Sequence, residues 1–186
     1  MPPGDRTRPT TDRVREALFS AIAAWAGTAA VPPDEALVGL AFADLYAGSG
    51  AVGLEAASRG AAPVLLVEGN KRIAQLTARN AAELGLAVRL HAGRVEQLLG
   101  EPSASAFDVA FLDPPYELAA GAVSTVLARL VGQGWLAEDG LLVVERSRRG
   151  ADLEWPAAVG ESWTKSYGET VLHFAALGPT AAEEHA

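Results

Sequence analysis

Cysteine is absent from the 186-residue sequence. Its absence excludes disulfide bonds, thiolate catalysis and zinc sites built on cysteine, and it fits the reducing cytoplasm. No apolar run approaches the ~20 residues that a membrane-spanning helix needs, and the start Met-Pro-Pro-Gly-Asp-Arg lacks the pattern of a signal peptide. We therefore expect a cytoplasmic protein with no membrane partner.

Histidine is also scarce. Metal sites usually place such ligands a few residues apart on one element, and His91, His173 and His185 show no such spacing. We expect these residues to be structural or solvated, and we expect no metal ion.

Positive charge is limited, and almost all of it is arginine. The net charge is −8, and the 15 basic residues include just two lysines, Lys71 and Lys165. Arginine binds phosphate through two nitrogens and stacks on bases, which suits RNA, but an arginine-rich proteome would give the same composition. Charge therefore does not decide for or against nucleic acid. The arginines gather near the start and after a late strand: Arg6, Arg8, Arg13 and Arg15, then Arg146, Arg148 and Arg149.

The length suits one domain with a full core. Short apolar runs alternate with segments of helical periodicity, which indicates an α/β fold with a mostly parallel sheet. We expect an irregular arm over 1–10, one domain over 11–177 and a flexible tail over 178–186. The predicted strands are 40–46, 64–68, 87–91, 107–112, 141–145, 163–167 and 170–176. The predicted helices begin at Thr11 or Asp12 and continue at 54–59, 71–84, 94–99 and 120–132.

A glycine-rich turn follows the first predicted strand, in the order Asp-Leu-Tyr-Ala-Gly-Ser-Gly-Ala-Val-Gly from Asp44 to Gly53. Glycine lets the backbone approach a ligand closely, and the N–H groups of the following helix are free. The same spacing is found in dinucleotide-binding proteins. Glu68, at the end of the second strand, can accept both ribose hydroxyls of an adenosine. These features predict an adenosine cofactor, either a dinucleotide or S-adenosylmethionine.

The fourth predicted strand ends in Asp113-Pro114-Pro115-Tyr116. An exocyclic amine of a base is a poor nucleophile, so its hydrogens must point at acceptors and its lone pair at the electrophile. The Asp113 carboxylate and the Pro114 carbonyl are two such acceptors, and the prolines hold them rigidly. Tyr116 offers a flat face for an extruded base, and such stacking contributes ~1–3 kcal/mol. We predict transfer of a methyl group to a base amine, with Asp113, Pro114 and Tyr116 as the catalytic residues.

The glycine turn, the second-strand acid and the Asp-Pro-Pro-Tyr corner, in this order, resemble the class I methyltransferases. The chain also resembles, more narrowly, the bacterial 16S ribosomal RNA guanine-N2 methyltransferases of the RsmD type. The resemblance spans 8 to about 176 and rests on 8–19 (Arg-Pro-Thr-Thr-Asp-Arg-Val-Arg-Glu-Ala-Leu-Phe), 44–55, 113–116, 134–136 and 167–170.

The resemblance implies a Rossmann-like, seven-stranded, mostly parallel sheet with helices on both faces. It implies S-adenosylmethionine as the methyl donor and a guanine of 16S ribosomal RNA, in an assembling small subunit, as the target. From the motifs and the resemblance together we expect cofactor binding by Asp44, Ala47, Gly48, Ser49, Gly50, Glu68, Gly69, Asn70 and Arg94. The resemblance places beside the site, to order it or to touch RNA, Arg8, Thr10, Thr11 and Arg15.

Two departures from the family pattern stand out. Where many class I enzymes have an acid that receives the adenine amine, this chain reads Ala-Gly-Arg-Val over 92–95, so backbone atoms or Arg94 are expected to hold the adenine. Only seven residues precede Arg8, where the family usually has a basic segment, and we hypothesise a truncated form or a late start codon.

Several alternatives stay open. The same chemistry acts on adenine N6 or cytosine N4 of DNA and on protein glutamine. A dinucleotide oxidoreductase fits the glycine turn and Glu68 but leaves the Asp-Pro-Pro-Tyr corner unexplained. A cofactor-binding or RNA-binding scaffold without turnover is the non-enzymatic alternative.

Overall fold

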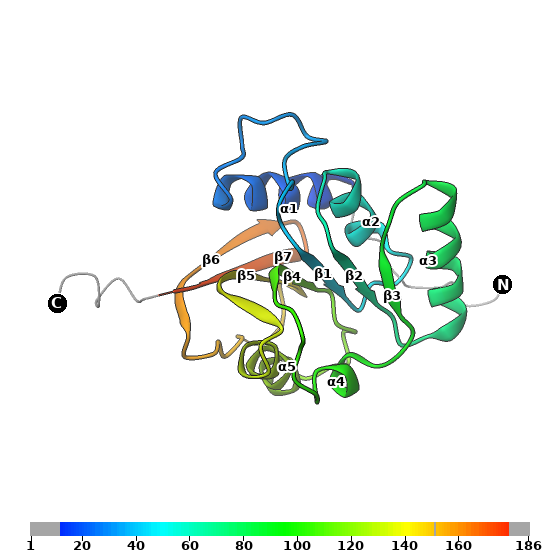
Figure 1. The fold of residues 1–186 in the computed structure, drawn as a ribbon. Helices are drawn as coiled ribbons and strands as arrows, with labels where there is room; N and C mark the ends of the chain where they lie inside the picture. The colour runs from blue at the N-terminus through cyan, green and yellow to red at the C-terminus, as the bar shows by residue number, and fades with distance from the viewer. Residues whose placement is uncertain (1–11, 151, 179–186) are drawn as a thin grey trace.

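The computed structural model describes residues 12–150 and 152–178, and these form one layered α/β unit (Figure 1). The expected arm and most of the expected tail lie outside the described residues. The elements in chain order are α1 (Asp12–Trp25), β1 (Phe42–Leu45), α2 (Ala51–Ser58), β2 (Val64–Val67), α3 (Lys71–Glu83), β3 (Arg89–His91), α4 (Val95–Leu98), β4 (Phe107–Leu112), α5 (Ala120–Gly132), β5 (Leu136–Ser147), β6 (Val159–Tyr167) and β7 (Thr170–Leu177).

Within the described residues the strands form a seven-stranded sheet in the order β3-β2-β1-β4-β5-β7-β6. The pairs from β3 to β5 are parallel, while β7 is antiparallel to both β5 and β6. The strand order reverses between β1 and β4, and open α/β sheets bind ligands at the carboxyl ends of the strands at such a point. The topology therefore directs attention to the segments that follow β1 and β4.

The sheet is covered on both faces, and residues alternate between two cores because successive strand side chains point to opposite sides. Phe42 packs in a core shared with α1, α2 and α3, whereas Ala43 packs in a second core shared with α4 and α5. Figure 1 shows α1 and α2 on one side of the sheet and α4 and α5 on the other. The predicted fold class is confirmed, including the mostly parallel sheet and the helices on both faces.

Several boundaries differ from the sequence prediction, with the largest shifts at the starts of β5, β6 and α2. Strand β6 begins at Val159, four residues earlier than expected. Strand β5 begins at Leu136, five residues earlier than expected, because its start pairs with Phe107 across an irregularity that apolar periodicity does not reveal. Helix α2 begins at Ala51, inside the expected glycine turn. Among the described residues, every helix is too short or too polar to span a bilayer.

Candidate active site

The glycine turn and the Asp-Pro-Pro corner lie side by side. Leu45, the last residue of β1, is paired with Leu112, the last residue of β4. Tyr46, which leads into the glycines, and Asp113, which opens the corner, therefore lie next to each other at the end of the sheet. The Asp113 N–H also donates to the Leu45 carbonyl at 3.4 Å. The structure thus brings two segments that are about 65 residues apart in sequence to one edge, as parallel strands require.

The glycine turn is shaped by backbone angles that favour glycine. Gly48 and Gly50 have φ of 54° and 84°, in the left-handed region. A Cβ on Gly48 or Gly69 would meet no atom within 4 Å, so the backbone there faces open space, whereas a Cβ on Gly50 would come within 2.6 Å of Thr77 Cγ2. The turn therefore presents an open backbone surface above a tightly packed base.

Glu68 connects the turn to the segment after β2. Its Oε2 accepts the Gly48 N–H at 2.9 Å, and its Oε1 accepts the Asn70 N–H at 2.6 Å. Asn70 in turn caps α3, because its Oδ1 accepts N–H groups from the first turn of that helix. Each carboxylate oxygen has a second lone pair, so Glu68 retains acceptors for two hydroxyls while it fixes both segments.

Helix α3 holds the turn from below, which the sequence analysis did not foresee. The Thr77 hydroxyl lies 2.7 Å from the Gly48 carbonyl and 3.0 Å from that of Ile73. Asn80 Nδ2 donates to the Ser49 carbonyl at 3.3 Å. Thr77 is fully buried. The signal available in the sequence was a threonine on the apolar face of an amphipathic helix. Its partner, however, lies 29 residues earlier in the chain.

Asp44 lies beneath the turn and not on its open surface. It is 1% exposed, and its Oδ2 accepts the Gly53 N–H at 2.8 Å. Burial, together with the charge of Glu68, raises the pKa of Asp44 to about 7, although the hydrogen bond from Gly53 acts in the opposite direction. In this structure Asp44 orients the first turn of α2. The Ala47 N–H donates to the Val67 carbonyl, which joins the glycine turn to β2.

Asp113 is surrounded by other charges. The pKa of Asp113 is raised to about 7, first by the loss of hydration among protein atoms, then by the carboxylates of Glu145 and Asp44, with Arg146 opposing them. Asp113 is exposed, Pro114 is buried, and Tyr116 is 67% exposed. The corner thus combines a proline that is packed into the protein with an aromatic ring that is open to solvent. Glu145 was missed from the sequence, because it reads there as part of a buried strand.

The segment after β3 contains an acid that the sequence prediction did not use. Glu96, in the first turn of α4, accepts the Tyr46 hydroxyl at 3.0 Å and lies 3.4 Å from Arg94 Nε. Burial alone would raise the pKa of Glu96, but hydrogen bonds from its own backbone, Tyr46 and Arg94 outweigh burial and lower it. Arg94 is thereby linked through Glu96 to Tyr46, which follows β1.

The residues expected to touch RNA are only partly described. Arg8, Thr10 and Thr11 lie outside the described residues. Arg15 pairs with Glu55 of α2 and with Asp12 of its own helix. Its guanidinium therefore braces α1 against α2 and is not brought to the Asp-Pro-Pro corner.

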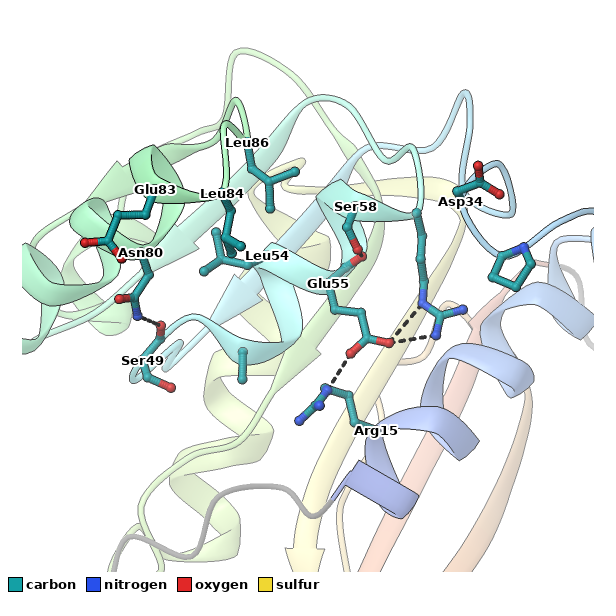
Figure 2. A pocket seen from close by; sticks show the side chains of 13 residues that line it. Arg15, Asp34, Ser49, Leu54, Glu55, Ser58, Asn80, Glu83, Leu84 and Leu86 are labelled. Carbon is teal, nitrogen blue, oxygen red and sulfur yellow. Dashed lines mark hydrogen bonds and ion pairs between the residues drawn. The ribbon is translucent and has the colours of Figure 1, made fainter.

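A hollow of about 800 Å³ lies over the outer face of α2, between α1 and α3. Figure 2 shows Leu54, Leu84 and Leu86 gathered on one side of it and Glu55 facing Arg15 on the other. Its lining includes Ser49 but neither Gly48 nor Asp113. This hollow therefore reaches the glycine turn at Ser49 but does not include the Asp-Pro-Pro corner.

The open glycine backbone and the Glu68 carboxylate fit the adenosine and amino-acid parts of S-adenosylmethionine. Together with the sheet order, the site defines a class I, S-adenosylmethionine-dependent methyltransferase. Solved structures agree with this fold. The yhhF protein of Escherichia coli superposes with a TM-score of 0.78 at 30% identity, covering 97% of this chain and 92% of that chain. An RNA methyltransferase from Salinibacter ruber, solved with S-adenosyl-L-homocysteine, has a TM-score of 0.64 at 20% identity, covering 92% of this chain and 94% of that one.

The family model described as "Conserved hypothetical protein 95" matches residues 1–176. The chain belongs to this family, the RsmD family of methyltransferases. The ribosomal RNA small subunit methyltransferase D of Escherichia coli K12 is 34% identical over 146 residues, which are 78% of this chain and 67% of that protein. The protein of the same name from Haemophilus influenzae is 31% identical over 161 residues, 84% of this chain and 74% of that protein.

Proposed function

We propose that this enzyme transfers a methyl group from S-adenosylmethionine to the exocyclic N2 of a guanine in 16S ribosomal RNA. The observation that supports the proposal is the pairing of Leu45 with Leu112, which brings the Asp-Pro-Pro corner to the same sheet edge as the open glycine turn. The relatives named for the small ribosomal subunit supply the substrate class.

When bound, S-adenosylmethionine supplies an electrophilic methyl on a sulfonium. The protein residues then have two tasks, to bind and to orient. The Asp113 carboxylate and the Pro114 carbonyl accept the two hydrogens of the guanine amine, which directs its lone pair away from the corner and towards the turn. Tyr116 stacks on the base, and Asp113 can accept the proton that the amine loses, since its pKa is raised to about 7.

The cofactor contacts proposed from the sequence divide into two kinds. Glu68 would bind the ribose hydroxyls, and the backbone of Ala47, Gly48, Ser49 and Gly50 would line the methionine part, with Gly69, Asn70 and Arg94 at the adenosine end. Asp44 would act through the turn that it orients. An assembling small subunit as substrate and a cytoplasmic location complete the proposal, with residues 11–177 as its single domain.

The test compares Asp113→Ala with Asp139→Ala, which removes the same group from an exposed position near the start of β5. Radiolabelled methyl incorporation would be measured on small subunits, naked 16S RNA, DNA and a glutamine-containing protein. We expect incorporation into ribosomal RNA at a guanine N2, its loss in Asp113→Ala and its retention in Asp139→Ala. S-adenosylhomocysteine should bind all three proteins alike in calorimetry. Preferential labelling of DNA or protein, or near-normal rates for Asp113→Ala, would refute the proposal.

A further inference from the structure

Three arginines follow one another within four residues at the end of β5, namely Arg146, Arg148 and Arg149. The parallel register of β4 and β5 pairs Leu112 with Val144. Strand β5 therefore delivers these arginines to the same sheet edge as the Asp-Pro-Pro corner, only a few residues beyond it. We call residues 146–149 the arginine loop.

Arg146 connects the arginine loop to the corner. Its Nη2 donates to the Leu118 carbonyl at 3.0 Å, which fixes the segment that follows Tyr116. Arg146 is also close enough to Asp113 to affect its electrostatics. The loop and the corner are therefore held together, so a nucleotide bound at one lies near the other.

The backbone of the arginine loop is held by hydrogen bonds, while the side chains of Arg148 and Arg149 are exposed. The Arg148 N–H donates to the Glu169 carbonyl at 2.8 Å, and the Gly150 N–H closes a turn on the Ser147 carbonyl at 2.9 Å. Arg149 lies 3.5 Å from Glu169 Oε2 with 86% of its side chain exposed. Arg148 is exposed and makes no ion pair with the residues that the structure describes.

An exposed ion pair of this kind contributes only ~0–1 kcal/mol, so a phosphate can replace Glu169 as the partner of Arg149 at little cost. The overall charge of −8 means that RNA affinity must come from local clusters of cations, because net electrostatic attraction is absent. Within the described residues Arg15 and Arg59 form ion pairs with Glu55. Their charges are therefore less available to bind phosphate.

We propose that Arg148 and Arg149 bind the phosphates of the RNA strand that flank the methylated base. This rests on the proposed function, since it assumes an RNA whose target base is held at Asp113 and Tyr116. Arginine suits this role because its planar group contacts a phosphate through two nitrogens. Such contacts position the strand without reading its sequence. Arg146 serves as the link between the loop and the corner.

The experiment uses the full chain with the double variant Arg148→Ala/Arg149→Ala. The matched control is Arg79→Ala/Arg89→Ala, which removes the same charge from exposed positions on α3 and at the start of β3. Affinity for a 16S RNA fragment carrying the methylation site, mapped in the wild type, would be measured at several salt concentrations, together with methyl-transfer kinetics.

For the Arg148/Arg149 variant we expect the negative slope of log K against log salt to become shallower by about 1.4–1.8, the value for two lost phosphate contacts. The KM for RNA should rise at least tenfold, while the KM for S-adenosylmethionine and the kcat at saturating RNA stay near wild type. The control should keep the wild-type slope. Equal slopes in the two double variants would overturn the inference, and so would a loss of kcat with no change in RNA affinity. If the wild type methylates no RNA, the proposed function fails; if it methylates RNA and the slopes are equal, only the arginine loop assignment fails.

Discussion

Thr77 offers a sharp test of how helix α3 supports the glycine turn. Its hydroxyl lies 2.7 Å from the Gly48 carbonyl, while the Gly48 N–H is held by Glu68 at 2.9 Å. The Gly48 residue is therefore fixed from both sides. Thr77→Val keeps the shape of the side chain and its contact with Gly50 but removes the hydroxyl.

The expected loss follows from the burial of the group. Leaving the part-buried Gly48 carbonyl without this donor costs ~1–3 kcal/mol, and for a protein of this size each kcal/mol lowers Tm by about 2–4 °C. If cofactor binding has to restore the order of the turn, the Kd for S-adenosylhomocysteine should rise by about 5- to 10-fold, which corresponds to about 1.0–1.4 kcal/mol. Thr77→Ser should retain most of the affinity, because it keeps the hydroxyl.

Calorimetry and thermal unfolding would be run beside Thr125→Val. Thr125 makes a similar hydroxyl-to-carbonyl bond within α5, to Gly121 at 2.9 Å, but is exposed. We expect this control to change the free energy of unfolding by less than about 0.5 kcal/mol and to leave the Kd unchanged. The reasoning would be refuted if both valine variants bound cofactor equally, or if Thr77→Ser were as impaired as Thr77→Val.

Three further predictions follow from charge and packing. Because Asp113 must be ionised to accept the amine hydrogens and its pKa is raised to about 7, single-turnover methyl transfer should accelerate as pH rises from about 6 to 8. Because the pKa of Asp44 is raised from 3.8 to about 7 in the folded state, the free energy of unfolding should fall as pH rises through this window, and less so in Asp44→Asn. Gly53→Ala places its Cβ 2.0 Å from Leu66 Cδ2 and should destabilise the fold by ~1–3 kcal/mol.

Each of these has its own control. A flat pH–rate profile would show that ionisation of Asp113 does not control methyl transfer, provided that Asp139→Ala behaves as wild type. Equal pH dependence of unfolding in wild type and Asp44→Asn would show that another group titrates there. Gly121→Ala on α5, where a Cβ meets nothing within 4 Å, should instead be neutral or stabilising by up to ~1 kcal/mol; an equal effect of both glycine variants would contradict the packing argument.

The amino-acid sequence by itself determined the type of each element and which residues lie at the ends of the strands. Continuous apolar runs such as Val64–Val67 predict strands covered on both faces, and that pattern is local. Glycines at positive φ and the Asp-Pro-Pro corner are also local, because they depend on the backbone preferences of the residues themselves. The fold class and the two facing segments could be predicted for this reason.

Only the tertiary structure decided which groups support those segments. Thr77 contacts Gly48 from a helix packed below the turn, Glu145 approaches Asp113 from a neighbouring strand, and Glu96 meets Tyr46 across the sheet edge. None of these pairs is close in sequence, so no periodicity or spacing reports them. Their interactions exist because strand order and register bring the carboxyl ends of β1, β2, β3, β4 and β5 to one edge, and burial there changes what each polar group can do.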